Sequence, residues 1–308
     1  MRVALNRRLH TKPTGPLLFM QRLVDELIRM GVKFVDLRSG PNILLALINY
    51  RPKDIPRNTK VVLRVDGVYW NLQDKNRHLN KDIFSSVRTA DGVVFQSEFC
   101  KQCVELNSGQ SKLNTVIFNA VNMKEIQKIA PAKMMRRPGL LACARWRPTK
   151  RAKSICEGFL ASNIPHQLYM VGKTPNKKIK HKRITWLGEL SNHDSIAVMK
   201  SCTHAIHLGK FDPCPNSVIE AIGCGLPVLH TANGGTPEIV KDQGIRMPVD
   251  GDWDFKFSKS GVDDIDPMLT AKYLEDLVKM PAAVLRQELK IKYAAKQYHK
   301  FFRKVMKS

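Results

Sequence analysis

Short apolar runs alternate with longer amphipathic segments along most of the chain, and this alternation restricts the fold more than any other feature. Strands that alternate with helices indicate a parallel sheet with helices on both of its faces. In the first part of the chain the pattern predicts helices at 16–30, at 41–49 and from Ser97 onward. The strands expected there are 3–5, 33–37, 61–65, 92–96 and 115–118.

A segment rich in Lys, Arg and Pro, residues 124–138, interrupts the alternation and is typical of a linker. The pattern then restarts, with helices expected at 153–162, 194–201, 216–223 and 236–240. The strands expected in this part are 140–144, 167–171, 184–187, 204–208, 226–229 and 245–248. Residues 266–308 are expected to be helical throughout.

Two successive α/β sets in a chain of 308 residues predict two Rossmann-like domains. We expect a cleft between these domains and a C-terminal helix that returns to the first of them. The expected boundaries are residues 1–130 for the first domain and 131–260 for the second. Residues 261–308 are expected to form helices that pack back on the first domain.

The last part of the tail, residues 289–306, carries Tyr293, Tyr298, Phe301 and Phe302 among many lysines. Packing of this aromatic stripe on the protein body is the favoured interpretation. The alternative is a basic amphipathic helix that lies on a membrane. The chain has 51 Lys and Arg against 27 Asp and Glu, a net charge of +24. Such a charge attracts phosphates, nucleic acid or an anionic membrane without choosing among them.

Residues 212–238, DPCPNSVIEAIGCGLPVLHTANGGTPE, contain the strongest chemical pattern in the chain. They follow an expected strand, and ligands of open α/β sheets bind beyond the carboxyl ends of the strands. Asn216 and Ser217 are good N-cap residues for the helix that follows, whose N-terminus offers N–H groups to a phosphate. Glu220 lies one turn further, within reach of a sugar hydroxyl. Gly234 and Gly235 allow a close backbone approach before Glu238.

A second basic pattern follows the strand expected at 140–144. Arg145 and Lys150 lie five residues apart in the loop there. A guanidinium fork and an ammonium at such a place can bind an anionic group such as a phosphate. His207, on an expected buried strand, is interpreted as a core residue.

Residues 212–238 closely resemble the donor-binding signature of glycosyltransferase family four, a group with the GT-B fold. Arg145 and Lys150 have the spacing of a basic pair that is common in that family. Asp212 and Glu220 have the spacing of the family's two acidic residues, with Asp212 where many members have Glu. Gly225-Leu226-Pro227-Val228 and Gly234-Gly235-Thr236-Pro237-Glu238 follow as they do in that family. The resemblance spans roughly residues 2–250 and is strongest after residue 139.

The resemblance implies a retaining transfer of a sugar from a nucleotide diphosphate donor, with no obligatory metal and no cofactor. The first domain would face the acceptor, which is an unidentified glycan, lipid or protein, and the second would bind the donor. Asp212, Arg145 and Lys150 would be catalytic, and Asp66 would replace a histidine that touches the transferred sugar. The implied donor-binding residues are Glu220, Asn216, Ser217, Gly15, Gly188, Gly235 and Glu238.

Other readings stay open. A sugar-nucleotide epimerase would use the same donor on the same fold, and the basic surface would also suit a non-enzymatic nucleic-acid-binding protein. The second is disfavoured because no aromatic-interleaved basic motif occurs. Cys100 and Cys103 form a lone CxxC, which is too few ligands for a structural zinc site. An odd number of cysteines and the lack of a signal peptide predict a cytoplasmic protein, with peripheral contact with an anionic membrane as an alternative.

Overall fold

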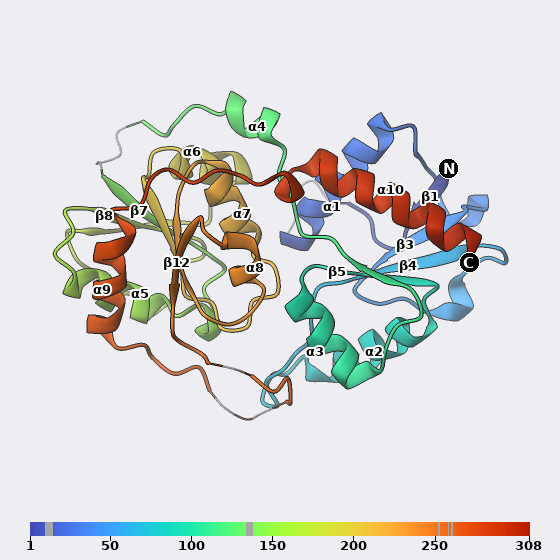
Figure 1. The fold of residues 1–308 in the computed structure, drawn as a ribbon, viewed down its shortest axis with the longest axis horizontal. Coiled ribbons are helices and arrows are strands. Elements are labelled where there is room, and N and C mark those ends of the chain that lie inside the picture. The colour runs from blue at the N-terminus through green and yellow to red at the C-terminus, as the bar shows by residue number, and fades with distance from the viewer. Residues whose placement is uncertain (10–14, 134–137, 252, 258, 260) are drawn as a thin grey trace. The chain divides into compact units, whose positions relative to one another are not determined.

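The computed structural model describes residues 1–9, 15–133, 138–251, 253–257, 259 and 261–308. The chain divides into two compact units (Figure 1). The first unit consists of Met1–Ala120, Asp254–Ser260 and Gln287–Ser308, and the second of Val121–Trp253 and Gly261–Arg286. Each unit is built around a parallel six-stranded sheet, so the predicted pair of Rossmann-like domains is confirmed.

The first sheet has the strand order β2-β1-β3-β4-β5-β6. Its helices are α1 (Gly15–Arg29), α2 (Asn80–Thr89), α3 (Glu98–Ser108) and α10 (Ile291–Lys307). Ser97 caps α3, because its side chain accepts a hydrogen bond from the Cys100 N–H. The strands are β1 (Arg2–Leu5), β2 (Lys33–Phe34), β3 (Ile43–Leu47), β4 (Lys60–Val65), β5 (Gly92–Phe95) and β6 (Asn114–Val116).

The second sheet has the strand order β12-β11-β10-β7-β8-β9. Its helices are α4 (Met123–Lys128), α5 (Ala152–Ala161), α6 (Asn192–Met199), α7 (Asn216–Gly223), α8 (Thr236–Val240) and α9 (Pro267–Leu277). The strands are β7 (Gly139–Cys143), β8 (Gln167–Val171), β9 (Ile184–Gly188), β10 (His204–His207), β11 (Val228–Thr231) and β12 (Gly244–Met247). Among the described residues, no helix combines the length and apolar character that a membrane span needs.

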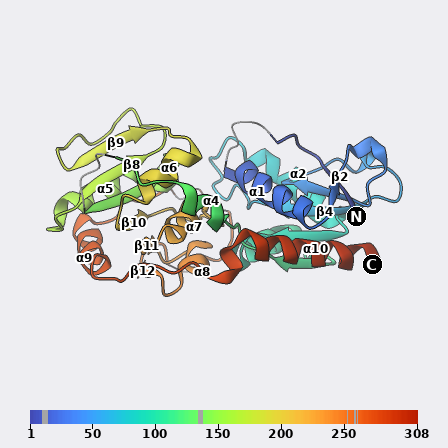
Figure 2. The same ribbon diagram turned by 90° about the horizontal axis from the view of Figure 1, so that it is seen from above.

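The tail is shared between the units, which differs from the expectation for residues 261–308. Helix α9 packs on α5 in the second unit, where Gly158 leaves room for Thr270. Only residues from Gln287 onward join the first unit. There α10 packs along α1 (Figure 2). Of the aromatic stripe, Tyr298, Phe301 and Phe302 are buried, whereas Tyr293 is exposed. The expected return of the C-terminal helix to the first unit is therefore confirmed for α10 alone.

Three further expectations are corrected. Residues 41–49 form strand β3 rather than a helix, since a short, wholly buried apolar run fits a central strand equally well. The segment 124–138 begins with α4 and belongs to the second unit, which starts at Val121 rather than 131; residues 134–137 of that segment lie outside the described part. Residues 278–286 form no helix, so the tail is not helical throughout.

Candidate functional site

The strand order of the second sheet reverses between β7 and β10, which pair in parallel. From β7 the chain proceeds to β8 and β9 on one side, and then to β10, β11 and β12 on the other. Open α/β sheets bind ligands at such a switch point, outside the carboxyl ends of the strands. The loops that leave β7 and β10 at this point are the segments from which the sequence predicted Arg145, Lys150 and Asp212.

The structure brings Lys150 and Asp212 together. The Lys150 ammonium forms an ion pair with the Asp212 carboxylate, and the two side chains are only 21% and 12% exposed. The backbone N–H of Lys210 also donates to the Thr149 carbonyl at 2.9 Å, which joins the two loops directly. A cation and a carboxylate are thus fixed side by side at the switch point.

His207 adds an imidazole to this pair. Its Nε2 atom lies 3.3 Å from Asp212 Oδ2, and its side chain is almost fully buried. Burial lowers the pKa of His207; the contact with Asp212 acts in the opposite direction, while Lys150 lowers the pKa further. Burial by itself raises the pKa of Asp212, but Lys150 and His207 outweigh it and hold that pKa well below its ordinary value. At neutral pH the cluster therefore contains a carboxylate, an ammonium and a neutral imidazole.

The Gly-Gly turn after β11 supports the Asp212 loop from the other side. The Gly235 N–H donates to the Asp212 carbonyl at 2.8 Å. Gly234 has φ of +98°, and a Cβ there would lie 2.9 Å from the same carbonyl oxygen. Glycine is therefore required at 234 by both backbone conformation and space. The Gly235 N–H is therefore occupied by the Asp212 carbonyl and is not directed at a ligand.

Glu220 is buried within α7, where it accepts a hydrogen bond from Asn192 Nδ2 at 2.9 Å. Glu220 also acts on Cys143 at the end of β7. Burial, together with the negative charge of Glu220, raises the pKa of the Cys143 thiol to about 12. The N-cap of α7 is Pro215, whose side chain forms no capping hydrogen bond. The expectation that Asn216 or Ser217 is the N-cap is therefore wrong. Both lie in the first turn and are half-buried.

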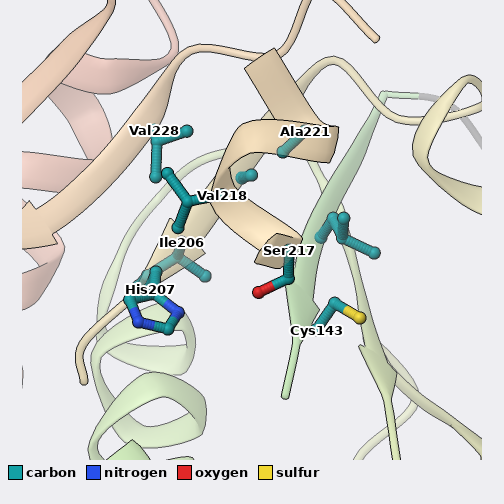
Figure 3. Close-up of a pocket in the computed structure, with 9 residues that line it drawn as sticks. Cys143, Ile206, His207, Ser217, Val218, Ala221 and Val228 are labelled. Carbon is teal, nitrogen blue, oxygen red and sulfur yellow. The ribbon is translucent and has the colours of Figure 1, made fainter. Parts of the chain in front are cut away.

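A small pocket lies between this first turn of α7 and the ends of β7 and β10. Figure 3 shows Cys143, His207 and Ser217 around it, with apolar side chains of α7 and the strands behind them. The lining residues are Leu141, Cys143, Ala205, Ile206, His207, Ser217, Val218, Ala221 and Val228. The pocket thus connects the helix N-terminus with the His207–Asp212–Lys150 cluster.

The remaining predicted residues of the second unit lie on the same edge of the sheet or on α8. Arg145 is exposed on the loop after β7 and forms no ion pair within the described part of the chain. Gly188 ends β9 with φ of +72°, and no atom lies within 4 Å of a Cβ placed there. Glu238 is half-buried in the first turn of α8, and Arg286 donates to its carbonyl at 2.8 Å.

Asp66 and Gly15 belong to the first unit. Gly15 begins α1 and is exposed, while Thr14, which precedes it, lies outside the described residues. Asp66 follows β4 and is part of a closed ring of hydrogen bonds. Arg64 and Gln96 both donate to Asp66 Oδ1, the latter at 2.7 Å. Asn119 donates to Gln96 at 2.9 Å and accepts from Arg64 at 2.6 Å.

This ring uses only one of the two carboxylate oxygens of Asp66, Oδ1. Oδ2 is buried and has no hydrogen-bond partner among the described residues. Burial raises the pKa of Asp66, and the positive charges of Arg64 and Arg7 offset this only in part. The ring therefore fixes one oxygen of the carboxyl and directs the other away from it.

Sequence reasoning missed several of these residues. The sequence places His207 in the core, and its side chain is indeed buried. Its ring also contacts the Asp212 carboxylate, which the sequence did not indicate. Gln96 and Asn119 each follow a strand of the first sheet, and this position was a signal that they face a site. Asn192 gave no signal, because its pairing with Glu220 joins α6 to α7 across 28 residues of sequence.

Two Rossmann-like units, each with a parallel six-stranded sheet, define a GT-B fold. The whole chain superposes on sucrose-phosphate synthase from Thermosynechococcus elongatus with a TM-score of 0.71 and 14% identity, covering 99% of each chain. Residues 124–256, which include most of the second unit, match the family model "Glycosyl transferases group 1". That match supports a glycosyltransferase.

Two other solved structures show the same fold. AviGT4, a glycosyltransferase involved in avilamycin A biosynthesis, is 15% identical with a TM-score of 0.69, covering 99% of this chain and 98% of AviGT4. Anabaena HepE, solved in complex with UDP-glucose, is 13% identical with a TM-score of 0.66, again covering 99% and 98%. No curated protein matches the sequence.

Proposed function

We propose that the chain is a glycosyltransferase that takes a sugar from a nucleotide diphosphate donor bound at the carboxyl edge of the second sheet. The observation that carries this proposal is the ion pair between Lys150 and Asp212 at the β7–β10 switch point, next to the N-terminus of α7. Cations and a helix N-terminus suit a diphosphate, and a buried carboxylate suits sugar or ribose hydroxyls. The HepE structure with UDP-glucose supports a donor of this kind.

Each residue has a proposed role. Arg145 and Lys150 stabilise the charge that develops on the departing diphosphate, together with the α7 N-terminus at Asn216 and Ser217. Glu220, held by Asn192, accepts hydrogen bonds from the ribose hydroxyls. Gly188 leaves space for the nucleoside, since no atom lies within 4 Å of the position that a Cβ would occupy there. Asp212 and Glu238 act near the sugar, and Gly235 fixes the Asp212 loop.

The first unit is proposed to face the acceptor, with Gly15 and Asp66 near the transferred sugar. Asp66 Oδ2 is the oxygen available for a hydroxyl, because the ring occupies Oδ1. The acceptor is a glycan, a lipid or a protein. Retention of anomeric configuration, independence of metal and cofactor, and a cytoplasmic location complete the proposal and follow from the family resemblance and the cysteine content.

Incubation of the full chain with a panel of nucleotide sugars tests the reaction, with and without EDTA. We expect slow release of the nucleoside diphosphate from one donor, unchanged by EDTA, and binding of that donor by calorimetry. NMR of the transferred or hydrolysed sugar then reports its anomeric configuration. Conversion of the donor into its epimer, with the nucleotide still attached, would favour the epimerase instead. Binding of no nucleotide at all would overturn the proposed site.

A further inference from the structure

Helix α10 has two unlike faces, and only one of them is used by the fold. Its apolar side is buried in the core of the first unit, where Tyr298 lies against Phe19 with ring centroids 6.3 Å apart. Gly92 makes room for the end of the helix, since a Cβ there would lie 2.6 Å from Val305 Cγ2. This side is therefore unavailable to any other partner.

The opposite side of α10 carries only positive charge. The helix has six Lys and Arg residues and no Asp or Glu, and all six cations are exposed: Lys292, Lys296, Lys300, Arg303, Lys304 and Lys307. Except for the adjacent pair Arg303 and Lys304, each lies three or four residues from the next, so they are neighbours on one helix surface and repel each other. Among the described residues, none of the six forms an ion pair.

The N-terminal amino group lies near His299 of α10 and adds another positive charge there. Burial lowers the pKa of His299, and the positive charges of Arg303 and the N-terminal amino group lower it further. Two large side chains, Tyr293 and Met306, are 37% and 38% exposed toward opposite ends of the helix. The exposed face is thus a cationic row with one aromatic and one aliphatic side chain near its ends.

We propose that this face of α10 binds the anionic surface of a lipid bilayer. The row from Lys292 to Lys307 is about 22 Å long at 1.5 Å per residue, and a straight helix presents it to a plane. Clusters of four to eight Lys and Arg on an amphipathic helix are suited to anionic lipid headgroups. Tyr293 and Met306 can enter the headgroup layer, whereas they offer little for reading base edges.

The binding is electrostatic and peripheral, because the apolar face that would insert into a bilayer is already packed against α1. This distinguishes it from a helix that lies with its apolar side in the membrane. It also does not depend on the proposed sugar transfer, since no residue of the second unit takes part.

Co-sedimentation of the full chain with vesicles tests the proposal, and the basic loop of the second unit provides a matched control. The row variant is Lys292→Gln with Lys296→Gln and Lys300→Gln. The control variant is Lys177→Gln with Lys178→Gln and Lys180→Gln, which removes the same charge from exposed positions of a loop. Equal thermal unfolding of both variants and the unmodified chain shows that the fold is kept.

We expect the unmodified chain to sediment with phosphatidylcholine vesicles only when they contain phosphatidylglycerol, and less so as salt rises. The row variant should bind about 100-fold more weakly, at about fivefold for each cation near the surface, and the control variant should lose far less. An equal loss in both variants would show that the net charge, and not α10, drives binding. Absence of vesicle binding, or tighter binding of duplex DNA at the same salt, would equally overturn the proposal.

Discussion

Lys150 and Asp212 are joined by an ion pair across the two loops that leave the second sheet at its switch point. The same Asp212 oxygen lies 3.3 Å from His207 Nε2, and the Asp212 carbonyl accepts from Gly235. A diphosphate that binds Lys150 therefore competes with a carboxylate that is fixed in place from three directions.

The Asp212→Asn variant should unfold more easily at neutral pH. The pKa of Asp212 lies below its ordinary value, so its carboxylate stabilises the fold above about pH 4 and loses this effect as the pH falls toward the folded-state pKa. We expect a loss of about 1.5–3 kcal/mol at pH 7 that shrinks below about pH 4. Urea unfolding across this range measures it. The exposed Asp54→Asn variant is the control, and a pH-independent difference for Asp212→Asn would contradict the prediction.

Removal of either proposed diphosphate cation should lower turnover more than donor affinity. Charge builds on the leaving oxygen as the glycosidic bond breaks, so a cation there interacts more strongly with the transition state than with the bound donor. We expect Arg145→Ala and Lys150→Ala each to lower single-turnover rates by about 10²–10³. Arg147→Ala, on the same exposed loop, is the control. Normal rates in both variants, or activity that EDTA abolishes and a divalent metal restores, would refute the metal-free role of these cations.

Glu220→Gln should weaken nucleotide binding with little effect on the fold, since the volume of the side chain is kept. Loss of a hydrogen bond to a charged acceptor costs about 1.5–3 kcal/mol, which is about 10- to 100-fold in affinity. Calorimetry with the nucleoside diphosphate that the unmodified chain binds measures this change. Asn192→Ala, which removes one hydrogen-bond partner of Glu220, should cause a smaller loss. Equal affinity in Glu220→Gln and the unmodified chain would exclude Glu220 from the donor site.

The contact between α5 and α9 should not tolerate a methyl group at position 158. A Cβ on Gly158 would lie 2.3 Å from Thr270 Cβ, so Gly158→Ala forces the helices apart, at a cost of about 1–3 kcal/mol. Addition of Thr270→Gly should restore part of this loss, whereas Thr270→Ala should restore little because it keeps the clashing Cβ. Thermal unfolding compares the three variants. If Gly158→Ala alone is neutral, the helices are less tightly packed than described.

The sequence predicted much of the second unit because its elements carry local signals. Gly and Pro mark the ends of α7 and α8, and both helices have the predicted bounds. Strand β3 was misassigned because Ile43–Leu47 is buried on every side and has no alternation to reveal a strand. The side-chain partners of the site were harder still. Asn192 acts through a contact that tertiary packing creates and that no local pattern encodes. Gln96 and Asn119 follow strands, which indicates that they face a site, but their hydrogen bond to each other arises only from the packing of the sheet.

The division of the chain between the units has a consequence for its biosynthesis. The core of the first unit includes Tyr298, Phe301 and Phe302, yet Gln287–Ser308 is translated after the whole of the second unit. Domains that fold during synthesis normally do so in order from the N-terminus. Here the first sheet is made first but must wait with Phe19 and its neighbours uncovered until α10 leaves the ribosome. The second unit, whose last segment ends at Arg286, is complete earlier, so the half made second is the half that can finish folding first.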